Sequence, residues 1–162
     1  EMLGRSENLL NSAILKKGDY APAHFALARV YDEQGRVRES LSKLEAILAI
    51  APRDVGVYFQ LGLLHYRAGN KEAAARDFEN ALSLAPKYAN AAWYLATIYE
   101  EQGKLNQAIE LVRRVGELDP ENPLVKARLE KLAKGRGERL KTGGLPEPVD
   151  AGVSVGGGVG GR

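Results

Sequence analysis

The chain has 162 residues, of which 44% are hydrophobic and 27% are charged, and its formal net charge is +2. This length and composition are typical of a globular domain with a sizeable core. There is no cysteine, which excludes disulfide bonds, thiolate metal sites and cysteine nucleophiles. No apolar run approaches the ~18 residues that a membrane-spanning helix needs, and the first residues lack the pattern of a signal peptide.

The first predicted element is a helix over residues 3–16. Its apolar spacing is that of the second helix of a pair, and no partner helix comes before it. We interpret residues 1–20 as half of a repeat and the chain as a piece of a longer protein, in keeping with Met2 standing after Glu1.

From residue 21 the sequence repeats with a period of 34 residues, which places three units at 21–54, 55–88 and 89–122. An aromatic residue, a leucine, a small residue, a glycine and a proline each recur at this spacing. These columns are Phe25, Phe59 and Trp93; Leu27, Leu61 and Leu95; Ala28, Gly62 and Ala96; Gly35, Gly69 and Gly103; and Pro52, Pro86 and Pro120. A fixed period of about 20 to 50 residues is typical of a stack of units that bury their apolar faces against one another.

Each unit is predicted to be a pair of helices. In the second unit, apolar side chains recur at steps of three and four residues over 56–68 and again over 71–84, which is the spacing of one helix face. Gly69 lies between the two and suits the left-handed residue that ends a helix. The other pairs are expected near 22–34 and 37–50, and near 90–102 and 105–118.

A last helix is predicted over residues 122–134, with Asn122 as its N-cap and Pro123 in its first turn. It has one apolar side and charged remaining faces, as expected of a helix that closes a stack. Residues 135–162 hold 10 of the 18 glycines, and we predict that they form a flexible, disordered tail. The segment after residue 122 carries a net charge of +4. We interpret this charge as a solvated helix end rather than a contact for RNA or an anionic membrane.

These units resemble tetratricopeptide repeats, a family of 34-residue helical hairpins. The family's pattern is an aromatic, then Leu-Gly, then Tyr, then Ala, Phe and Ala on the second helix, and Pro. The second unit departs from it only at His65 and matches it at Tyr58, Leu61, Gly62, Ala74, Phe78, Ala81 and Pro86. The other two units match more loosely. Over residues 3–134 the resemblance implies an all-α fold, an open right-handed solenoid of helix-turn-helix hairpins.

The sequence offers little for catalysis. His24 and His65 are the only histidines, and each stands in a column where the family usually has an aromatic, so we interpret them as core residues. No Ser-His-Asp set, metal-ligand spacing or phosphate-binding loop is present. We therefore expect no catalysis, no cofactor and no metal site in this chain.

The resemblance also implies that the first helix of each unit lines the inner, concave surface of the stack. The side chains expected to form a peptide-binding groove there are Phe25, Arg29, Phe59, Gln60, Leu63, Arg67, Trp93, Tyr94, Thr97, Glu100 and Glu101. We predict Phe59 and Trp93 to be the main anchors, because aromatics in desolvated positions carry much of the energy of binding. The alternative is that these aromatics only pack between neighbouring first helices.

Four carboxylates lie beside these columns, and two interpretations of them stay open. They are either solvated helix ends or an acidic rim that favours a basic or amphipathic peptide. The four are Asp32, Glu33, Glu100 and Glu101.

Some members of the family grip the acidic C-terminal tail of a chaperone with lysines, asparagines and an arginine on these inner faces. The set of matching positions lacks the residue types that such a carboxylate clamp needs, and a clamp is therefore not expected. These positions are Phe25, Arg29, Gln60, Asn90 and Tyr94.

The function that the resemblance implies is protein–protein interaction, as a scaffold or recruitment module that binds an extended peptide or a helix of another protein. We expect a monomer without a nucleic-acid partner, in the cytoplasm by default. The alternative is the soluble regulatory end of a larger membrane-anchored or enzymatic protein, and the sequence upstream of Glu1 would decide between the two.

Overall fold

The computed structural model describes residues 2–17 and 20–141, with side chains described for 7–17 and 20–137. Within these residues there are eight helices and no strand. The helices are α1 (Met2–Lys16), α2 (Ala21–Glu33), α3 (Val37–Ile50), α4 (Val55–Arg67), α5 (Lys71–Leu84), α6 (Ala89–Glu101), α7 (Leu105–Leu118) and α8 (Pro123–Lys141). The boundaries predicted for α1 to α7 agree with these to within one residue.

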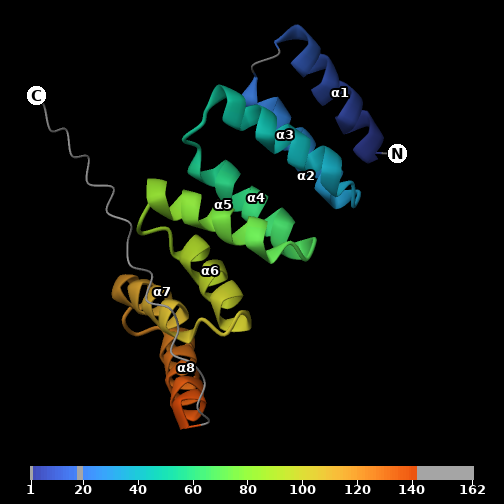
Figure 1. The fold of residues 1–162 in the computed structure, drawn as a ribbon. Coiled ribbons are helices and arrows are strands. Elements are labelled where there is room, and N and C mark those ends of the chain that lie inside the picture. The colour runs from blue at the N-terminus through green and yellow to red at the C-terminus, as the bar shows by residue number, and fades with distance from the viewer. Residues whose placement is uncertain (1, 18–19, 142–162) are drawn as a thin grey trace, which may run out of the picture.

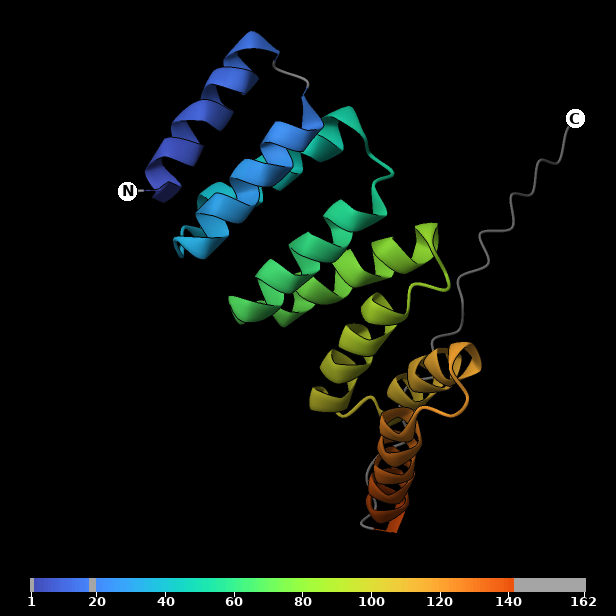
Figure 2. The same ribbon diagram turned by 180° about the vertical axis from the view of Figure 1, so that it is seen from behind.

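The helices form an open stack in which each helix packs against the one before it and the one after it (Figure 1). The first helices of the units, α2, α4 and α6, follow one another along one side of the stack and α8 continues them, whereas α3, α5 and α7 lie along the other side (Figure 2). We call the surface formed by α2, α4, α6 and α8 the inner face. The fold is an all-α solenoid of helical hairpins, as the sequence predicts.

Glycine closes the first helix of every unit. Gly35, Gly69 and Gly103 have φ values of 72°, 80° and 73°, in the left-handed region that side chains with a Cβ disfavour. In the second unit, the Gly69 N–H donates to the Tyr66 carbonyl at 3.0 Å. This geometry confirms the role predicted for Gly69, and it explains why glycine recurs every 34 residues.

Side-chain caps begin three of the helices. Asp54 Oδ1 accepts a hydrogen bond from the Val57 N–H at 3.0 Å, and Asn70 Oδ1 accepts one from the Ala73 N–H at 3.2 Å. Asn122 Oδ1 likewise accepts the N–H of residue 124 at 3.0 Å, as predicted from its position before Pro123. Each cap satisfies a backbone donor that the helix itself leaves unpaired.

Small residues let the two helices of a unit approach closely. Phe78 is fully buried and lies over Gly62, where an added Cβ would come within 2.6 Å of Phe78 Cε1. In the first unit a buried Ser40 stands in the corresponding second-helix column of alanines, and its hydroxyl donates to the Ala28 carbonyl at 2.8 Å. The leucine, small-residue and alanine columns are therefore packing residues.

The end of α8 differs from the prediction. The sequence places the end of this helix at residue 134 and a tail from residue 135, but α8 runs on to Lys141. Gly135 and Gly137 each disfavour a helix by about 1 kcal/mol relative to alanine, whereas the arginine, glutamate, leucine and lysine residues around them are better helix formers. Residues 135–141 thus belong to the helix, and the rest of the predicted tail, 142–162, lies outside the described residues.

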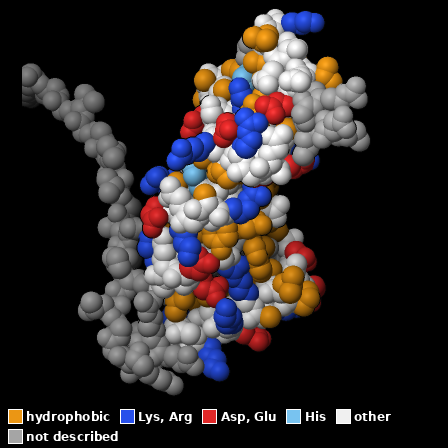
Figure 3. Space-filling model, turned by 90° about the vertical axis from the view of Figure 1, so that its right-hand side faces the viewer, with side chains coloured by type: hydrophobic (Ala, Val, Ile, Leu, Met, Phe, Trp, Pro, Cys, Tyr) orange, Lys and Arg blue, Asp and Glu red, His pale blue; other side chains and the backbone are white. Residues whose placement is uncertain are grey.

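Acidic and basic side chains are interspersed over the face of the molecule drawn in Figure 3, with hydrophobic side chains gathered between them in its middle and lower parts. Across the residues that the structure describes, no helix combines the length and the hydrophobicity required to cross a membrane.

Candidate functional site

The inner face has three joints, α2/α4, α4/α6 and α6/α8, and the middle one is closed by aromatic rings. The ring centroid of Phe59 lies 5.1 Å from that of Tyr88, 5.8 Å from Phe78 and 6.0 Å from Tyr94. Tyr94 in turn stacks on Phe78 at 5.6 Å with an interplanar angle of 17°. Edge-to-face and offset stacked rings at these distances are favourable pairs, and together they fill the space between α4 and α6.

Phe59 is therefore a packing residue. Only 9% of its surface is exposed, and it contacts aromatic rings from α5, from the N-cap of α6 and from α6 itself. For Phe59 the structure favours the alternative of packing over the predicted anchor role. Leu63 packs partly buried against the same cluster. Trp93 is in a different situation, because it is half-buried and lines an open depression.

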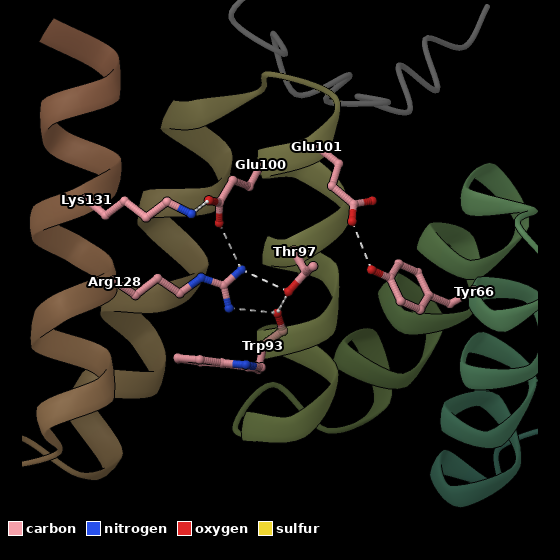
Figure 4. Close-up of polar contacts among 7 residues, drawn as sticks. All are labelled: Tyr66, Trp93, Thr97, Glu100, Glu101, Arg128 and Lys131. Carbon is pink, nitrogen blue, oxygen red and sulfur yellow. Dashed lines mark hydrogen bonds and ion pairs between the residues drawn. The ribbon is translucent and has the colours of Figure 1, made fainter. Parts of the chain in front are cut away.

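The larger depression lies in the α6/α8 joint and has a volume of about 690 Å³. Side chains from both helices line it (Figure 4). From α6 these are Trp93, Thr97, Glu100 and Glu101, and from α8 they are Ala127, Arg128 and Lys131.

Arg128 joins α8 to α6 within this depression. Its guanidinium carbon lies 4.4 Å from the centroid of the Trp93 ring, a cation–π contact. The guanidinium also donates hydrogen bonds to the Trp93 carbonyl at 3.4 Å and to Thr97 Oγ1 at 2.9 Å. It pairs with Glu100 Oε2 at 3.4 Å, and the Lys131 ammonium lies 2.7 Å from Glu100 Oε1. The Arg128 side chain is only 12% exposed, so these contacts hold it in one position.

Glu101 joins α6 to α4 and α5 at the edge of the same depression. Its carboxylate accepts a hydrogen bond from the Tyr66 hydroxyl at 2.9 Å (Figure 4) and pairs with Lys71 at 2.9 Å. The hydrogen bond from Lys71 lowers the pKa of Glu101, and the bond to Glu101 raises the pKa of Tyr66. Glu101 therefore stays ionised and Tyr66 stays protonated at neutral pH.

A second depression of about 370 Å³ lies on the inner face beside Phe25, in the α2/α4 joint. Two charged residues stand in its lining, and both have partners within the chain. Arg29 pairs with Glu33 at 3.8 Å, and Asp54 accepts the N-cap hydrogen bond of α4. The remaining lining residues are apolar: Ala21, Pro22, Phe25, Ala26, Ile47 and Val57.

The predicted acidic rim is neutralised by cations of the chain itself. Asp32 lies 2.7 Å from Arg67, Glu33 pairs with Arg29, and Glu100 and Glu101 have the partners described above. Each of the four carboxylates thus has a cation of the chain within 4 Å. Their role as a rim for basic ligands stays a prediction.

The residues predicted for the groove fall into four places. Phe25 and Arg29 line the α2/α4 depression, and Gln60 lies in a small recess beside both of them. Arg67 lies at the edge, bound to Asp32. The other predicted residues belong to the closed middle joint or to the α6/α8 depression: Phe59, Leu63 and Tyr94 to the first, and Trp93, Thr97, Glu100 and Glu101 to the second.

Sequence reasoning missed the contribution of α8. Ala127, Arg128 and Lys131 line the larger depression, although the sequence indicates only a solvated basic end helix there. The signal was available, because residues 127, 128 and 131 follow Trp93, Tyr94 and Thr97 by one period of 34. Continuing the period past the third unit would have placed α8 on the inner face.

The two histidines lie away from both depressions. His24 is 6% exposed and belongs to the core. His65 Nδ1 lies 2.7 Å from Asp77 Oδ2 between α4 and α5, and burial raises the pKa of Asp77. In the part of the chain that is described, no three His, Asp or Glu side chains are grouped to hold a metal ion.

Comparisons with known proteins agree with this architecture. Two family models described as tetratricopeptide repeat match residues 59–123 and 23–55, which together are more than half of the chain. The chain is 29% identical over 128 residues to the cellulose synthase 2 operon protein C of Komagataeibacter xylinus, and this match covers 78% of the chain and 10% of that protein. The chain thus spans about a tenth of the length of this relative.

Two solved structures share the fold. One is a tetratricopeptide repeat protein from Parabacteroides merdae, with a TM-score of 0.77 at 18% identity, covering 86% of this chain and 56% of that one. The other is the first tetratricopeptide repeat domain of Spaghetti (RPAP3) bound to an HSP90 peptide, with a TM-score of 0.65 at 20% identity, covering 72% and 93% of the two chains. The period, the helical hairpins, the left-handed glycines and the family models lead to one conclusion: the chain belongs to the tetratricopeptide repeat family.

Proposed function

We propose that the chain is a protein-interaction module that binds a segment of a partner polypeptide on its inner face, without catalysis of its own. The observation that carries this proposal is the α6/α8 depression of about 690 Å³ beside the half-buried Trp93. Its size lies within the range of about 300 to 1,000 Å³ that is typical of ligand pockets. An aromatic side chain in a partly desolvated hollow is the kind of residue that dominates binding energy at interfaces.

The rigidity of the walls supports the same proposal. Arg128 is held by Trp93, Thr97 and Glu100 at once, and Glu101 is held by Tyr66 and Lys71. Side chains that are already fixed lose little conformational entropy when a ligand binds, which favours affinity. The inner face thus presents a preorganised surface rather than a set of mobile charged groups.

Capture from a peptide library tests this function. Wild-type protein should retain a subset of peptides, and Trp93→Ala should lose most of them, because truncating such an anchor typically costs about 2 kcal/mol or more of binding energy. An exposed alanine on the far side of α8 from the depression offers a matched control, Ala133→Phe, which should retain the same peptides as wild type. Thermal unfolding of each variant separates lost binding from lost structure. If Trp93→Ala folds and still retains every peptide, the inner face is not the binding site.

A further inference from the structure

Every charged side chain that lines either depression already has a partner within the chain. Arg29 pairs with Glu33, and Asp54 caps α4. In the other joint, the charged side chains bind one another or neighbouring residues: Glu100, Glu101, Arg128 and Lys131. A charged ligand group would have to compete with these pairs, whereas an apolar group would displace only water. The chemistry of the lining therefore selects uncharged, apolar side chains.

The two open joints are separated by a closed one. The α4/α6 joint is filled by Phe59, Tyr88 and Tyr94, and the two depressions lie on either side of it. Neighbouring packed helices lie about 8 to 10 Å apart, and the two depressions are two such steps apart. The separation between the entry points is thus about 16 to 20 Å.

Gln60 on α4 lies between the two entry points and indicates the conformation of the ligand. It is half-buried and lines a small recess together with Phe25 and Arg29. An amide offers both donors and an acceptor, which complement the free N–H and C=O groups of an extended chain. In a helical ligand these groups would already be bonded to each other.

We propose, building on the function above, that the ligand is an extended segment of a partner protein with two uncharged apolar side chains about six residues apart. One side chain enters the α2/α4 depression beside Phe25, and the other enters the α6/α8 depression beside Trp93. The spacing follows from the separation of the entry points, because an extended chain rises by about 3.3 Å per residue. The segment between the two anchors passes Gln60 and needs no charge.

The test uses the full chain and neutral, fluorescein-labelled Ser/Gly peptides that carry two phenylalanines. Fluorescence anisotropy compares the peptide whose phenylalanines are about six residues apart with three kinds of control. These are a peptide with a spacing of about three residues, the two single-phenylalanine peptides, and an alanine-rich helical peptide. In the helical peptide the phenylalanines are about thirteen residues apart, which spans the same distance at about 1.5 Å per residue. The six-residue spacing should bind at least about tenfold tighter than either single-anchor peptide, and its affinity should not weaken as sodium chloride is raised.

Variants that fill one depression assign each anchor. Ala26 lines the α2/α4 depression and Ala127 lines the α6/α8 depression, so Ala26→Phe and Ala127→Phe should each fill one of them. Each variant should bind the two-phenylalanine peptide no more tightly than a single-phenylalanine peptide. The exposed Ala49 on α3 and Ala133 on α8 provide matched controls, Ala49→Phe and Ala133→Phe, which should leave binding unchanged.

The outcomes separate this inference from the proposed function. Equal affinity of single- and double-anchor peptides, tighter binding of the helical peptide, or a steep loss of affinity with salt would overturn the two-anchor inference. If library peptides still need Trp93 in that case, the proposed function survives it. If neither the designed nor the library peptides bind, both fail.

Discussion

The guanidinium of Arg128 lies over the indole of Trp93, 4.4 Å from the ring centroid, although 35 residues separate the two in the chain. This contact makes α8 part of the inner face as well as the end of the stack. The helix packs against α7, and its Val125, Leu129 and Leu132 belong to or pack against the core cluster. Its Arg128 side chain contacts α6.

Removing this contact should loosen α8. Arg128→Ala deletes a cation–π interaction, typically worth about 0.5 to 2 kcal/mol, together with hydrogen bonds from a side chain that is 12% exposed. We expect the free energy of unfolding in urea to fall by about 1 to 2 kcal/mol. Lys126→Ala, which removes an exposed pair with Glu121, should change it by less than about 0.5 kcal/mol. Equal effects of the two substitutions would show that Arg128 does not hold α8.

The two aromatics that the sequence predicts as equivalent anchors should behave differently. Phe59→Ala should lower the free energy of unfolding by about 3 to 5 kcal/mol, because Phe59 is a core residue with 9% exposure. Trp93→Ala should cost less stability and more peptide affinity. Urea unfolding and anisotropy titration of both variants check this, and it is wrong if Phe59→Ala remains as stable as Trp93→Ala.

The fold could be predicted from the sequence because every packing column recurs with the period. Gly69 ends a helix and Gly62 makes room for Phe78 within a single unit, so their roles do not depend on the neighbouring unit. The inner face was harder to predict, because Phe25, Phe59 and Trp93 share one column but face different joints. Their exposure depends on residues at the start of the next first helix. The N-cap of α6, for example, is the aromatic Tyr88, whereas the N-cap of α4 is Asp54. A column identifies the face of a helix, and the identity of the neighbouring side chains decides whether that face is open.

Two glycines within helices should respond in opposite directions to the same substitution. Gly62→Ala would place a Cβ 2.6 Å from Phe78 and should lower the free energy of unfolding by about 1 to 3 kcal/mol. Gly137→Ala meets nothing within 4 Å and should raise the stability of α8 by about 0.5 to 1 kcal/mol, because alanine is the better helix former. Circular dichroism during urea unfolding measures both, and stabilisation by Gly62→Ala would contradict the packing described here.

Two carboxylates should show opposite dependence on pH. Burial raises the pKa of Asp77 above its ordinary value of 3.8, so the folded state holds this proton more tightly than the unfolded state does. The stability that this proton provides is complete below pH 3.8 and is lost as pH rises through the folded pKa. Asp77→Asn should therefore gain stability relative to wild type as pH rises from about 3.5 to 6.5.

Glu101 should behave in the opposite way, because Lys71 lowers its pKa below the ordinary value of 4.5. Its contribution is present above pH 4.5 and is lost as pH falls through the folded pKa. Glu101→Gln should thus be less stable than wild type at neutral pH and approach it in acid. Urea unfolding across this pH range distinguishes the two variants, and parallel pH profiles would contradict both assignments.

Trp93 is the only tryptophan of the chain, so its fluorescence reports on the α6/α8 depression alone. A titration of the full chain with a tryptophan-free peptide captured from the library tests the central claim most directly. We expect a saturable change in emission whose midpoint equals the Kd obtained from anisotropy, and its loss in Ala127→Phe but not in Ala133→Phe. A peptide that binds with the same Kd while leaving the emission of Trp93 unchanged would contradict binding on the inner face.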